Sequence, residues 1–309
     1  MAFLHVLPDR LTIAIADGQS VLQATLGHGI PHVHACGGQS KCSTCRVVVL
    51  EGLDNCLPRN AAEQQLADKL NLPAEVRLAC QTSVRGNVQL RRPIVDELDL
   101  AMARRAVEAP GQRLGEEKQV AILFTDIENY TPFAEALPPY DIIHVLNRYF
   151  RLMNEVIARH HGFLIDYVGD GLLVIFGLER PAQAVADALA AVTDMLQAVD
   201  RLNPYLQQMY GRGFRVRAGL HYGPVVVGHL GEGASRKLAA IGDNVNMASR
   251  IESANKELGT QFLVSEAVVQ AAGPGLLTAR SCSRTLKGKS GHHLLYEIVP
   301  MAPAVRGTR

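Results

Sequence analysis

The stretch Ala239-Ala-Ile-Gly-Asp-Asn-Val-Asn-Met-Ala-Ser-Arg-Ile-Glu252 passes from an apolar run through a Gly-Asp step into a helical pattern. Asp243 is a favourable N-cap, because its carboxylate can accept hydrogen bonds from the first free N–H groups of a helix. Asn246 and Arg250 are four residues apart and therefore share one helix face. An amide that orients a sugar oxygen and a fork-shaped cation that neutralises phosphate suit a polyphosphate ester, although such a pair also fits a solvated helix face.

The composition indicates an ordinary globular protein of about two domains. The chain has 309 residues, of which 48% are hydrophobic and 20% charged, and its net charge is +1. So small a charge supplies no bulk field for nucleic acid or an anionic membrane, and we expect neither as a partner. No apolar run approaches the roughly 18 residues of a spanning helix, and no export signal opens the chain, so we expect a cytoplasmic location.

The first region, about residues 1–95, contains short apolar runs punctuated by glycine. The runs cover residues 11–15, 45–50 and 88–90, and a helical pattern covers 63–70. Apolar runs of this length bounded by turn residues predict a small sheet with tight turns.

Four of the six cysteines in the chain follow the spacing C-x5-C-x2-C-x34-C, namely Cys36, Cys42, Cys45 and Cys80. Thiolates are soft ligands, and four of them suit tetrahedral zinc or an iron–sulfur cluster. Three of these cysteines share one glycine-rich loop and the fourth is remote, whereas zinc sites prefer two CxxC pairs. The spacing therefore favours a flat iron–sulfur cluster over zinc or over cysteines with a purely structural role.

Residues 35–46 and 78–81 resemble the 2Fe–2S ferredoxins, in the branch with five residues between the first two cysteines. The resemblance covers about 90 residues. It implies a β-grasp-like domain at residues 1–95 in which Cys36, Cys42, Cys45 and Cys80 bind a 2Fe–2S cluster, and it leaves a redox partner open.

Residues 96–118 are expected to form a helical linker. Residues 96–108 have helical composition, and a Pro-Gly break follows them. The segment is either a plain connector or a helix that transmits redox state, by pairing with its copy in a dimer.

The second region, residues 119–300, alternates helical and strand patterns. A buried strand at 120–124 ends near Asp126, and two strands within 163–176 meet at a Gly-Asp-Gly turn that contains Asp170. The pattern predicts an α+β domain built on one mostly antiparallel sheet. Two aspartates at strand ends suit two Mg²⁺ ions, which take few carboxylates together with phosphate oxygens.

Four motifs in this region, residues 124–128, 167–171, 219–225 and 241–250, resemble the catalytic domain of class III nucleotide cyclases, which has a ferredoxin-like βαβ fold. The resemblance implies that Asp126 and Asp170 bind two Mg²⁺ or Mn²⁺ ions. It implies further that Asn246 orients the ribose and Arg250 stabilises the pentavalent phosphorus. The members work as homodimers, in which the aspartates of one chain face the Asn/Arg pair of the other.

Residues 286–290 resemble the segment that carries a triphosphate-binding lysine in this family. Both Lys287 and Lys289 are candidates for that role, and the sequence does not choose between them.

The base-reading positions of the family are occupied here by Asp166 and Ala239. Adenylate cyclases have Lys with Asp or Thr at these positions, and guanylate cyclases have Glu with Cys, so this chain fits neither pattern. The Asp166 carboxylate can accept from the adenine amino group or from guanine N–H groups. Its alternative role is an ion pair, with Lys237 as the nearest cation among the motifs.

We therefore expect an adenylate cyclase that converts ATP to 3′,5′-cyclic AMP and pyrophosphate at a homodimer interface, under the control of a 2Fe–2S cluster. A guanylate or relaxed-specificity cyclase is the first alternative. The alternative from another class is an electron-transfer ferredoxin whose cyclase-like domain binds a nucleotide without catalysis.

Overall fold

The structure, a computed structural model, describes residues 1–94, 96–108, 115–231 and 233–298. The chain divides into two compact units, Met1–Glu116 and Glu117–Arg309. The three-part division at residues 95 and 118 stays a prediction, and the Pro-Gly break of the expected linker lies outside the described residues.

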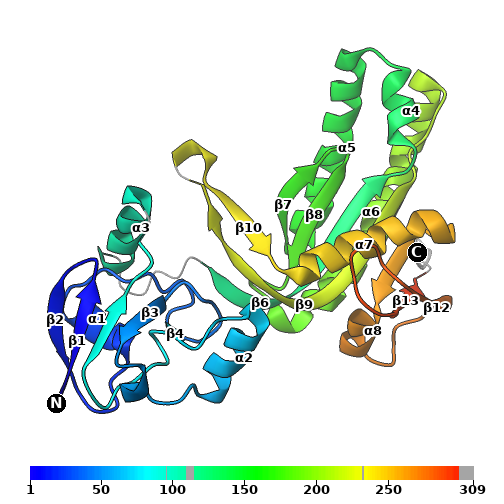
Figure 1. The fold of residues 1–309 in the computed structure, drawn as a ribbon. Coiled ribbons are helices and arrows are strands. Elements are labelled where there is room, and N and C mark those ends of the chain that lie inside the picture. Colours follow the sequence, from blue (N-terminus) through cyan, green and yellow to red (C-terminus); the bar gives the residue numbers. More distant parts are fainter. Residues whose placement is uncertain (95, 109–114, 232, 299–309) are drawn as a thin grey trace. The chain divides into compact units, whose positions relative to one another are not determined.

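The first unit is built on a five-stranded sheet with the order β2-β1-β5-β3-β4 (Figure 1). Its strands are β1 (Ala2–Leu7), β2 (Leu11–Ile15), β3 (Arg46–Glu51), β4 (Val76–Leu78) and β5 (Val88–Arg91). Its helices are α1 (Val21–Gly27), the short η1 (Leu53–Asn55), α2 (Ala61–Leu70) and α3 (Glu97–Glu108). β1 and β5 are parallel, and the neighbouring pairs are antiparallel. This mixed sheet with a helix packed on it is the β-grasp arrangement that was expected.

Local sequence explains the elements of this unit. Leu4 and Val6 alternate with exposed or half-exposed neighbours along β1, so that one face of the strand enters the core. α1 begins after Ser20, whose side chain accepts from the Gln23 N–H, while the Gln23 side chain accepts from the Ser20 N–H. This capping box satisfies two N–H groups that a helix start otherwise leaves free.

The second unit contains an eight-stranded sheet with the order β12-β13-β11-β9-β6-β8-β7, and β10 pairs with β9 outside this path (Figure 1). The strands are β6 (Glu116–Ile127), β7 (Gly162–Val168), β8 (Gly171–Phe176), β9 (Val216–Leu230), β10 (Lys237–Ile241), β11 (Phe262–Ser265), β12 (Arg280–Arg284) and β13 (His293–Glu297). The helices are α4 (Tyr130–Glu135), α5 (Pro139–Arg159), α6 (Ala184–Tyr210), α7 (Asp243–Leu258) and α8 (Glu266–Ala272), with short η2 (Pro181–Gln183) and η3 (Gly233–Ser235). β11 and β9 are parallel, whereas β6–β8, β7–β8 and β9–β10 are antiparallel.

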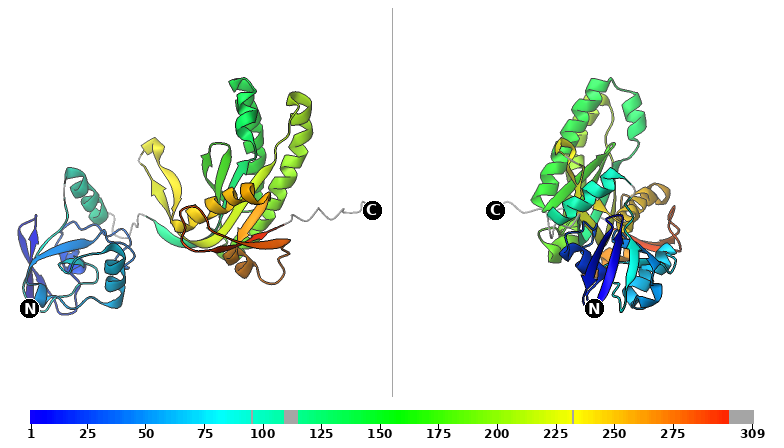
Figure 2. Two further views of the ribbon diagram at one scale, coloured as in Figure 1. Left: turned by 45° about the vertical axis from the view of Figure 1, so that its right-hand side comes forward. Right: turned by 60° about the vertical axis from the view of Figure 1, so that its left-hand side comes forward.

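Both faces of the centre of this sheet are covered, as β8 makes clear. All six of its residues are buried. Leu172, Val174 and Phe176 belong to a core that includes residues of α5 and α6 (Figure 2), and Leu173 and Ile175 belong to a second apolar cluster on the other face. A continuous apolar run is what a strand buried on both faces requires. The predicted α+β domain on a mostly antiparallel sheet is confirmed.

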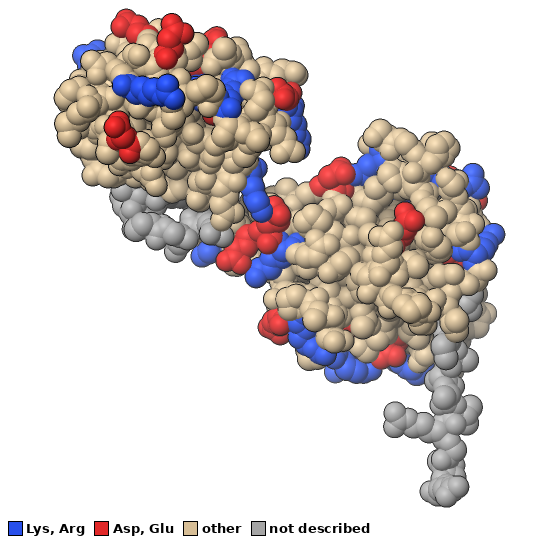
Figure 3. Space-filling model, turned by 90° about the horizontal axis from the view of Figure 1, so that it is seen from below, with Lys and Arg blue, Asp and Glu red and all other residues tan. Residues whose placement is uncertain are grey.

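The surface agrees with the near-zero net charge. On the face seen in Figure 3, acidic and basic side chains are interspersed over both units, and neither sign forms a continuous field. Among the helices that the structure describes, none is both long and apolar enough to cross a bilayer.

Candidate active site and candidate cluster site

The two strand-end aspartates of the second unit lie side by side. Asp126 is the penultimate residue of β6, and Asp170 lies in the turn between β7 and β8. β6 and β8 are antiparallel, so the end of one meets the start of the other, and Asp170 Oδ2 accepts from the Ile127 N–H at 3.1 Å. A Cβ at Gly171 would collide with the carbonyl oxygen of Thr125, so this close approach needs glycine.

The electrostatics of this pair fit a divalent cation. Burial, followed by the neighbouring Asp170 carboxylate, raises the pKa of Asp126 to about 6. Burial, followed by the charge of Asp126, raises the pKa of Glu252 to about 7, and its buried Oε1 has no hydrogen-bond partner within the described part of the chain. Carboxylates crowded in this way are the hard oxygen ligands that Mg²⁺ or Mn²⁺ prefers.

The protein does not enclose such an ion by itself. Among the described residues, no three His, Cys, Asp or Glu side chains converge as a complete metal-binding group. Mg²⁺ commonly takes one or two carboxylates together with water and substrate phosphates, so Asp126 and Asp170 are a sufficient protein contribution.

Two residues of this cluster, Arg217 and Glu252, are not among the site residues that the sequence predicts. Arg217 on β9 is only 7% exposed, and its Nη2 lies 3.6 Å from Glu128 Oε1. The positive charge of Arg217 lowers the pKa of Asp126 and so opposes the effect of burial. The alternation Arg215-Val-Arg217 within a strand pattern indicated that both arginines share one face. Burial of Glu252 had no comparable signal, because it follows from the packing of α7 on β9.

α7 lies against β9 so closely that Gly219 has no room for a side chain. A Cβ at Gly219 would collide with the backbone nitrogen of Glu252. This contact turns Glu252 towards the carboxylate cluster. Arg250 lies about 200° around the helix from Glu252, so it projects to the opposite side, and Asn246 shares its face.

Asn246 and Arg250 are therefore not brought to the aspartates of their own chain. Asn246 is exposed and Arg250 half-buried. Neither side chain makes a hydrogen bond or ion pair within the residues that the structure describes. The single chain presents the aspartate pair and the Asn/Arg pair as two separate half-sites.

The start of α7 differs from the expectation. Gly242, not Asp243, is the N-cap, and no side chain caps the helix. Asp243 is the first helical residue, and its carboxylate accepts from Lys289 Nζ, which also donates to the Asp243 carbonyl oxygen at 3.0 Å. The prediction was wrong because a cation 46 residues away in the sequence competes for the carboxylate.

This contact distinguishes Lys289 from Lys287, the other candidate for triphosphate binding. The Lys289 side chain is 9% exposed and ties residues 286–290 to the first turn of α7. The hydrogen bond from Lys289 is the main cause of a lowered pKa for Asp243. Lys287 is exposed, and its ammonium has no polar partner among the described residues.

Asp166 and Lys237 form an ion pair. Lys237 Nζ donates to Asp166 Oδ2 at 2.7 Å, which is the alternative role expected for Asp166. Ala239 on β10 is 9% exposed and has no polar side-chain atom.

The four patterned cysteines form two thiol pairs in the first unit. Cys42 influences the pKa of Cys36, and Cys45 and Cys80 influence each other's pKa, so the two thiols of each pair lie close together. All six cysteines of the chain are free thiols. Two pairs of sulfurs fit a 2Fe–2S cluster, which takes two thiolates for each iron.

The surroundings of Cys36 and Cys80 favour their thiolates, whereas the Cys80 neighbour and burial raise the pKa of Cys45. Burial by itself raises the pKa of the Cys36 thiol, but Cys42 and hydrogen bonds from backbone groups of the loop lower this pKa below its usual value. The loop can present these groups because Gly37 and Gly38 have φ values of 69° and 81°. The Gln81 Nε2–H donates to Cys80 Sγ at 3.4 Å.

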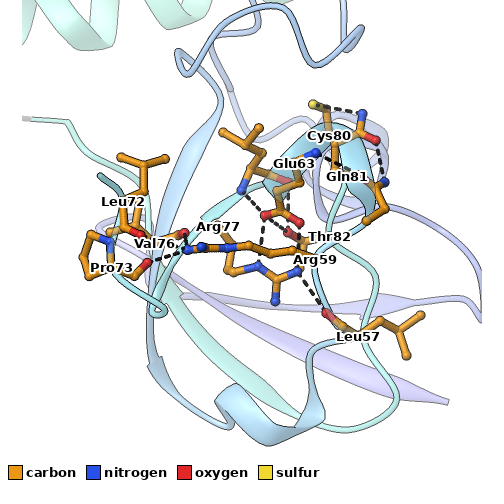
Figure 4. A network of polar contacts seen from close by, with 12 residues as sticks. Leu57, Arg59, Glu63, Leu72, Pro73, Val76, Arg77, Cys80, Gln81 and Thr82 are labelled. Atoms are coloured by element: carbon orange, nitrogen blue, oxygen red, sulfur yellow. Dashed lines mark hydrogen bonds and ion pairs between the residues drawn. The ribbon is translucent and has the colours of Figure 1, made fainter. Parts of the chain in front are cut away.

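A buried ion pair supports the segment that carries Cys80 (Figure 4). Arg77 donates to both carboxylate oxygens of Glu63 at 2.9 Å, and the two side chains are almost completely buried. Glu63 Oε1 also accepts from the Leu78 N–H at 2.8 Å and from the Thr82 hydroxyl at 3.4 Å. One carboxylate thus fixes residues on both sides of Cys80.

Both regions match families of known proteins. Residues 113–297 match the family described as "Adenylate and Guanylate cyclase catalytic domain", and residues 4–85 match the "2Fe-2S iron-sulfur cluster binding domain". Adenylate cyclase 1 of Rhizobium meliloti is 32% identical over 212 residues, which cover 67% of this chain and 32% of the relative. An adenylate cyclase of Anabaena cylindrica is 33% identical over 188 residues, which cover 59% of this chain and 37% of the relative. The chain thus matches about a third of the length of these relatives.

Solved structures with the fold of the second unit include enzymes of both specificities. The guanylyl cyclase Cya2 aligns with a TM-score of 0.57 and 26% identity, over 62% of this chain and 97% of that one. The adenylyl cyclase CyaB from P. aeruginosa aligns with a TM-score of 0.53 and 25% identity, over 61% of this chain and 97% of that one. The similarity therefore supports a nucleotide cyclase without choosing between ATP and GTP.

Proposed function

The chain belongs to the adenylate and guanylate cyclase catalytic domain family, and from this premise we propose that it converts ATP to 3′,5′-cyclic AMP and pyrophosphate. The observation that carries the proposal is the half-buried, adjacent Asp126/Asp170 pair together with an intact Asn246/Arg250 face on α7. A guanylate or relaxed-specificity cyclase is the second candidate, favoured by the acidic Asp166 and by the similarity to Cya2.

The residues divide the work of the reaction. Asp126 and Asp170 would hold two divalent cations, Mg²⁺ or Mn²⁺, which when bound supply Lewis-acid activation and neutralise the triphosphate charge. Asn246 orients the ribose so that its 3′-oxygen is in line with the α-phosphorus. Arg250 neutralises charge that develops on the phosphoryl oxygens as the bond to pyrophosphate breaks. The 3′-hydroxyl proton passes to solvent.

A second copy of the chain completes the site. Asn246 and Arg250 face away from the aspartates of their own chain, so a productive site takes its aspartates from one copy and its Asn/Arg pair from another. The resulting homodimer contains two equivalent sites, since a two-fold axis repeats every contact.

Lys287 is the better candidate for the triphosphate, because the Lys289 ammonium is already engaged by Asp243. We expect Lys287→Met to raise the KM for ATP with little change in thermal stability. Lys289→Met should lower the melting temperature, because it releases the first turn of α7.

The first unit would hold a 2Fe–2S cluster on Cys36, Cys42, Cys45 and Cys80 and would regulate the cyclase through the cluster's redox state or integrity. Turnover of cluster-oxidised protein, cluster-reduced protein and the Cys42→Ser variant tests this role. Different rates support regulation, whereas identical rates in all three would leave the cluster with a structural role only. A redox partner belongs to the same proposal.

The decisive experiment is product formation from ATP and from GTP, with Mg²⁺ or Mn²⁺, on anaerobically purified protein. Cyclic AMP as the main product is expected, and Asp126→Ala should abolish it. A wild-type protein that binds ATP without forming product would instead support an electron-transfer protein with a non-catalytic nucleotide domain.

A further inference from the structure

The Asp166–Lys237 ion pair joins two strands that are not neighbours in the sheet. Asp166 lies on β7, at one end of the strand order, and Lys237 lies on β10, which pairs with β9. The two strands approach each other nonetheless (Figure 1), and the ammonium and the carboxylate meet at 2.7 Å.

The pair contributes little to stability and leaves polar atoms available. The side chains of Lys237 and Asp166 are 59% and 46% exposed, and exposed ion pairs contribute only about 0–1 kcal/mol. The ammonium has three N–H groups and donates one to Asp166. Asp166 Oδ1 has no hydrogen-bond partner in the described part of the chain.

Lys237 occupies the same face of β10 as Ala239. Side chains two residues apart in a strand point to the same side of the sheet. Ala239 contributes only a methyl group to this face, so Lys237 is the residue of the two that can donate a hydrogen bond.

We propose that Lys237 and Asp166 together bind the Watson–Crick edge of the purine base and that the pair selects adenine. The inference rests on the proposed function, because it concerns the nucleotide bound beside Asn246 and Arg250. In it, Lys237 provides the donor that neither Asp166 nor Ala239 can provide.

The hydrogen-bonding pattern of the pair is complementary to adenine. The adenine edge presents the N6 amino donor beside the N1 acceptor. An ammonium and a carboxylate held side by side offer the matching donor to N1 and acceptor to N6. Guanine presents the O6 acceptor and two N–H donor groups. At positions 6 and 1 this pattern is the reverse of adenine's, so a pair that meets N6 and N1 of adenine would place its carboxylate against the guanine O6 acceptor and its ammonium against the N1–H donor.

The test compares wild-type protein with Lys237→Met, which removes the ammonium and keeps most of the length. The readouts are the affinities for the α,β-methylene analogues of ATP and GTP, together with kcat/KM for both triphosphates. A hydrogen bond to a charged group corresponds to roughly a 10-fold to 150-fold change in affinity. We expect a loss of this size for the ATP analogue, a fall in the ATP:GTP ratio and an unchanged melting temperature.

Two further variants serve as controls. Lys237→Arg keeps a donor and should retain most of the preference for ATP. Arg151→Met breaks the exposed Arg151–Glu155 pair, whose side chains are 82% and 54% exposed, and should change neither affinity nor preference.

The proposal and the enzymatic function fail in different ways. If Lys237→Met binds both analogues as the wild type does, or if the wild type prefers the GTP analogue, the assignment of the pair to adenine is overturned. If the wild type forms no cyclic nucleotide, the proposed activity fails. The binding measurement requires no turnover and still decides the role of the pair.

Discussion

Burial decides what each charged residue of this chain contributes. Glu63 and Arg77 are almost completely buried and satisfy each other with two parallel hydrogen bonds, whereas Lys237 and Asp166 are half-exposed. Breaking a buried pair leaves an uncompensated charge in a medium of low polarity, but breaking an exposed pair returns both charges to water. The same type of contact is therefore structural in the first unit and available for binding in the second.

The first prediction concerns Glu63→Gln. This change removes the negative charge opposite Arg77 and weakens the acceptor for the Leu78 N–H, which lies two residues before Cys80. We expect a loss of about 3–5 kcal/mol in the stability of the first unit, as is usual when one partner of a buried ion pair is removed. In denaturant titrations the visible absorbance of the cluster should disappear at a lower concentration. Exposed Glu51→Gln is the matched control; an unaltered midpoint for Glu63→Gln would contradict the prediction.

His221 gives the second unit a pH dependence. Its Nε2–H donates to Asn244 Oδ1 at 3.0 Å, and its Nδ1 lies 2.8 Å from the Ser265 hydroxyl. The Asn244 oxygen is the acceptor here because its Nδ2–H donates to the Pro224 carbonyl. Both bonds suit a neutral ring, and the pKa of His221 is lowered, chiefly by burial.

The sign of the effect follows from linkage. The unfolded His221 has a pKa near 6.5 and the folded one a lower pKa, so below about pH 6.5 the unfolded state binds more protons and stability falls with falling pH. The charged or titratable neighbours of the ring are Lys289, His293 and Asp243. Lys289 and His293 lower the pKa of His221, and Asp243 raises it.

The second prediction is that His221→Gln flattens this dependence. The fall in melting temperature between pH 7.5 and pH 5 should be smaller for His221→Gln than for the wild type. His229→Gln, at an exposed position on β9, should behave as the wild type does. Equal slopes for His221→Gln and the wild type would mean that the ring does not titrate in this window.

At the scale of elements, the contact between α7 and β9 holds the second unit's chemistry in place. α7 contributes Glu252 to the carboxylate cluster on one side and carries Asn246 and Arg250 on the other. The distance between helix and strand is set at Gly219, where there is no space for a Cβ. A small outward shift of α7 would therefore move Glu252 and the Asn246/Arg250 face together, relative to the aspartates on β6 and in the β7–β8 turn.

The third prediction follows from this packing. Gly219→Ala should force α7 away from β9, cost about 1–3 kcal/mol as overpacking does, and reduce cyclase turnover at least tenfold. Gly275→Ala, whose added Cβ would have no atom within 4 Å, is the control for the loss of glycine itself. Wild-type turnover and melting temperature in Gly219→Ala would rule out the close contact.

Elements whose pattern is local could be predicted from the sequence. The apolar runs at residues 11–15, 45–50 and 88–90 correspond to β2, β3 and β5, and the run at 120–124 lies within β6. β1 was not predicted, because only alternate residues of Ala2–Leu7 enter the core and the segment has no long apolar run. Its place beside β5 depends on a pairing across more than 80 residues, which local periodicity does not contain.

The site was predictable only where a motif carries it. Asp126, Asp170, Asn246 and Arg250 stand within recognisable motifs, and their roles stay proposals. The inward orientation of Arg217 and Glu252 depends on tertiary packing, and the Lys289–Asp243 contact depends on a turn far along the chain. Such long-range contacts also explain why Asp243 does not act as the expected cap.

At the scale of the whole molecule, the division of the site into two half-sites allows a quantitative test of whether the half-sites meet across a homodimer interface. In Asp126→Ala every site lacks an aspartate, and in Arg250→Ala every site lacks the guanidinium. Each variant alone should therefore be inactive. A mixed dimer, however, contains one site in which the intact aspartates of one chain face the intact Arg250 of the other.

The fourth prediction is that mixing the two inactive variants restores activity. Random exchange between equal amounts gives mixed dimers in half of the population, each with one intact site of two, so about a quarter of wild-type turnover is expected. Asp126→Ala mixed with Asp170→Ala is the matched control, because both defects lie in the same half-site and no mixed dimer can regain a complete pair of aspartates. Subunit exchange is checked by size-exclusion chromatography of differently tagged chains. If exchange is complete and the first mixture stays inactive, or if either variant is active alone, the two half-sites do not meet across a dimer interface.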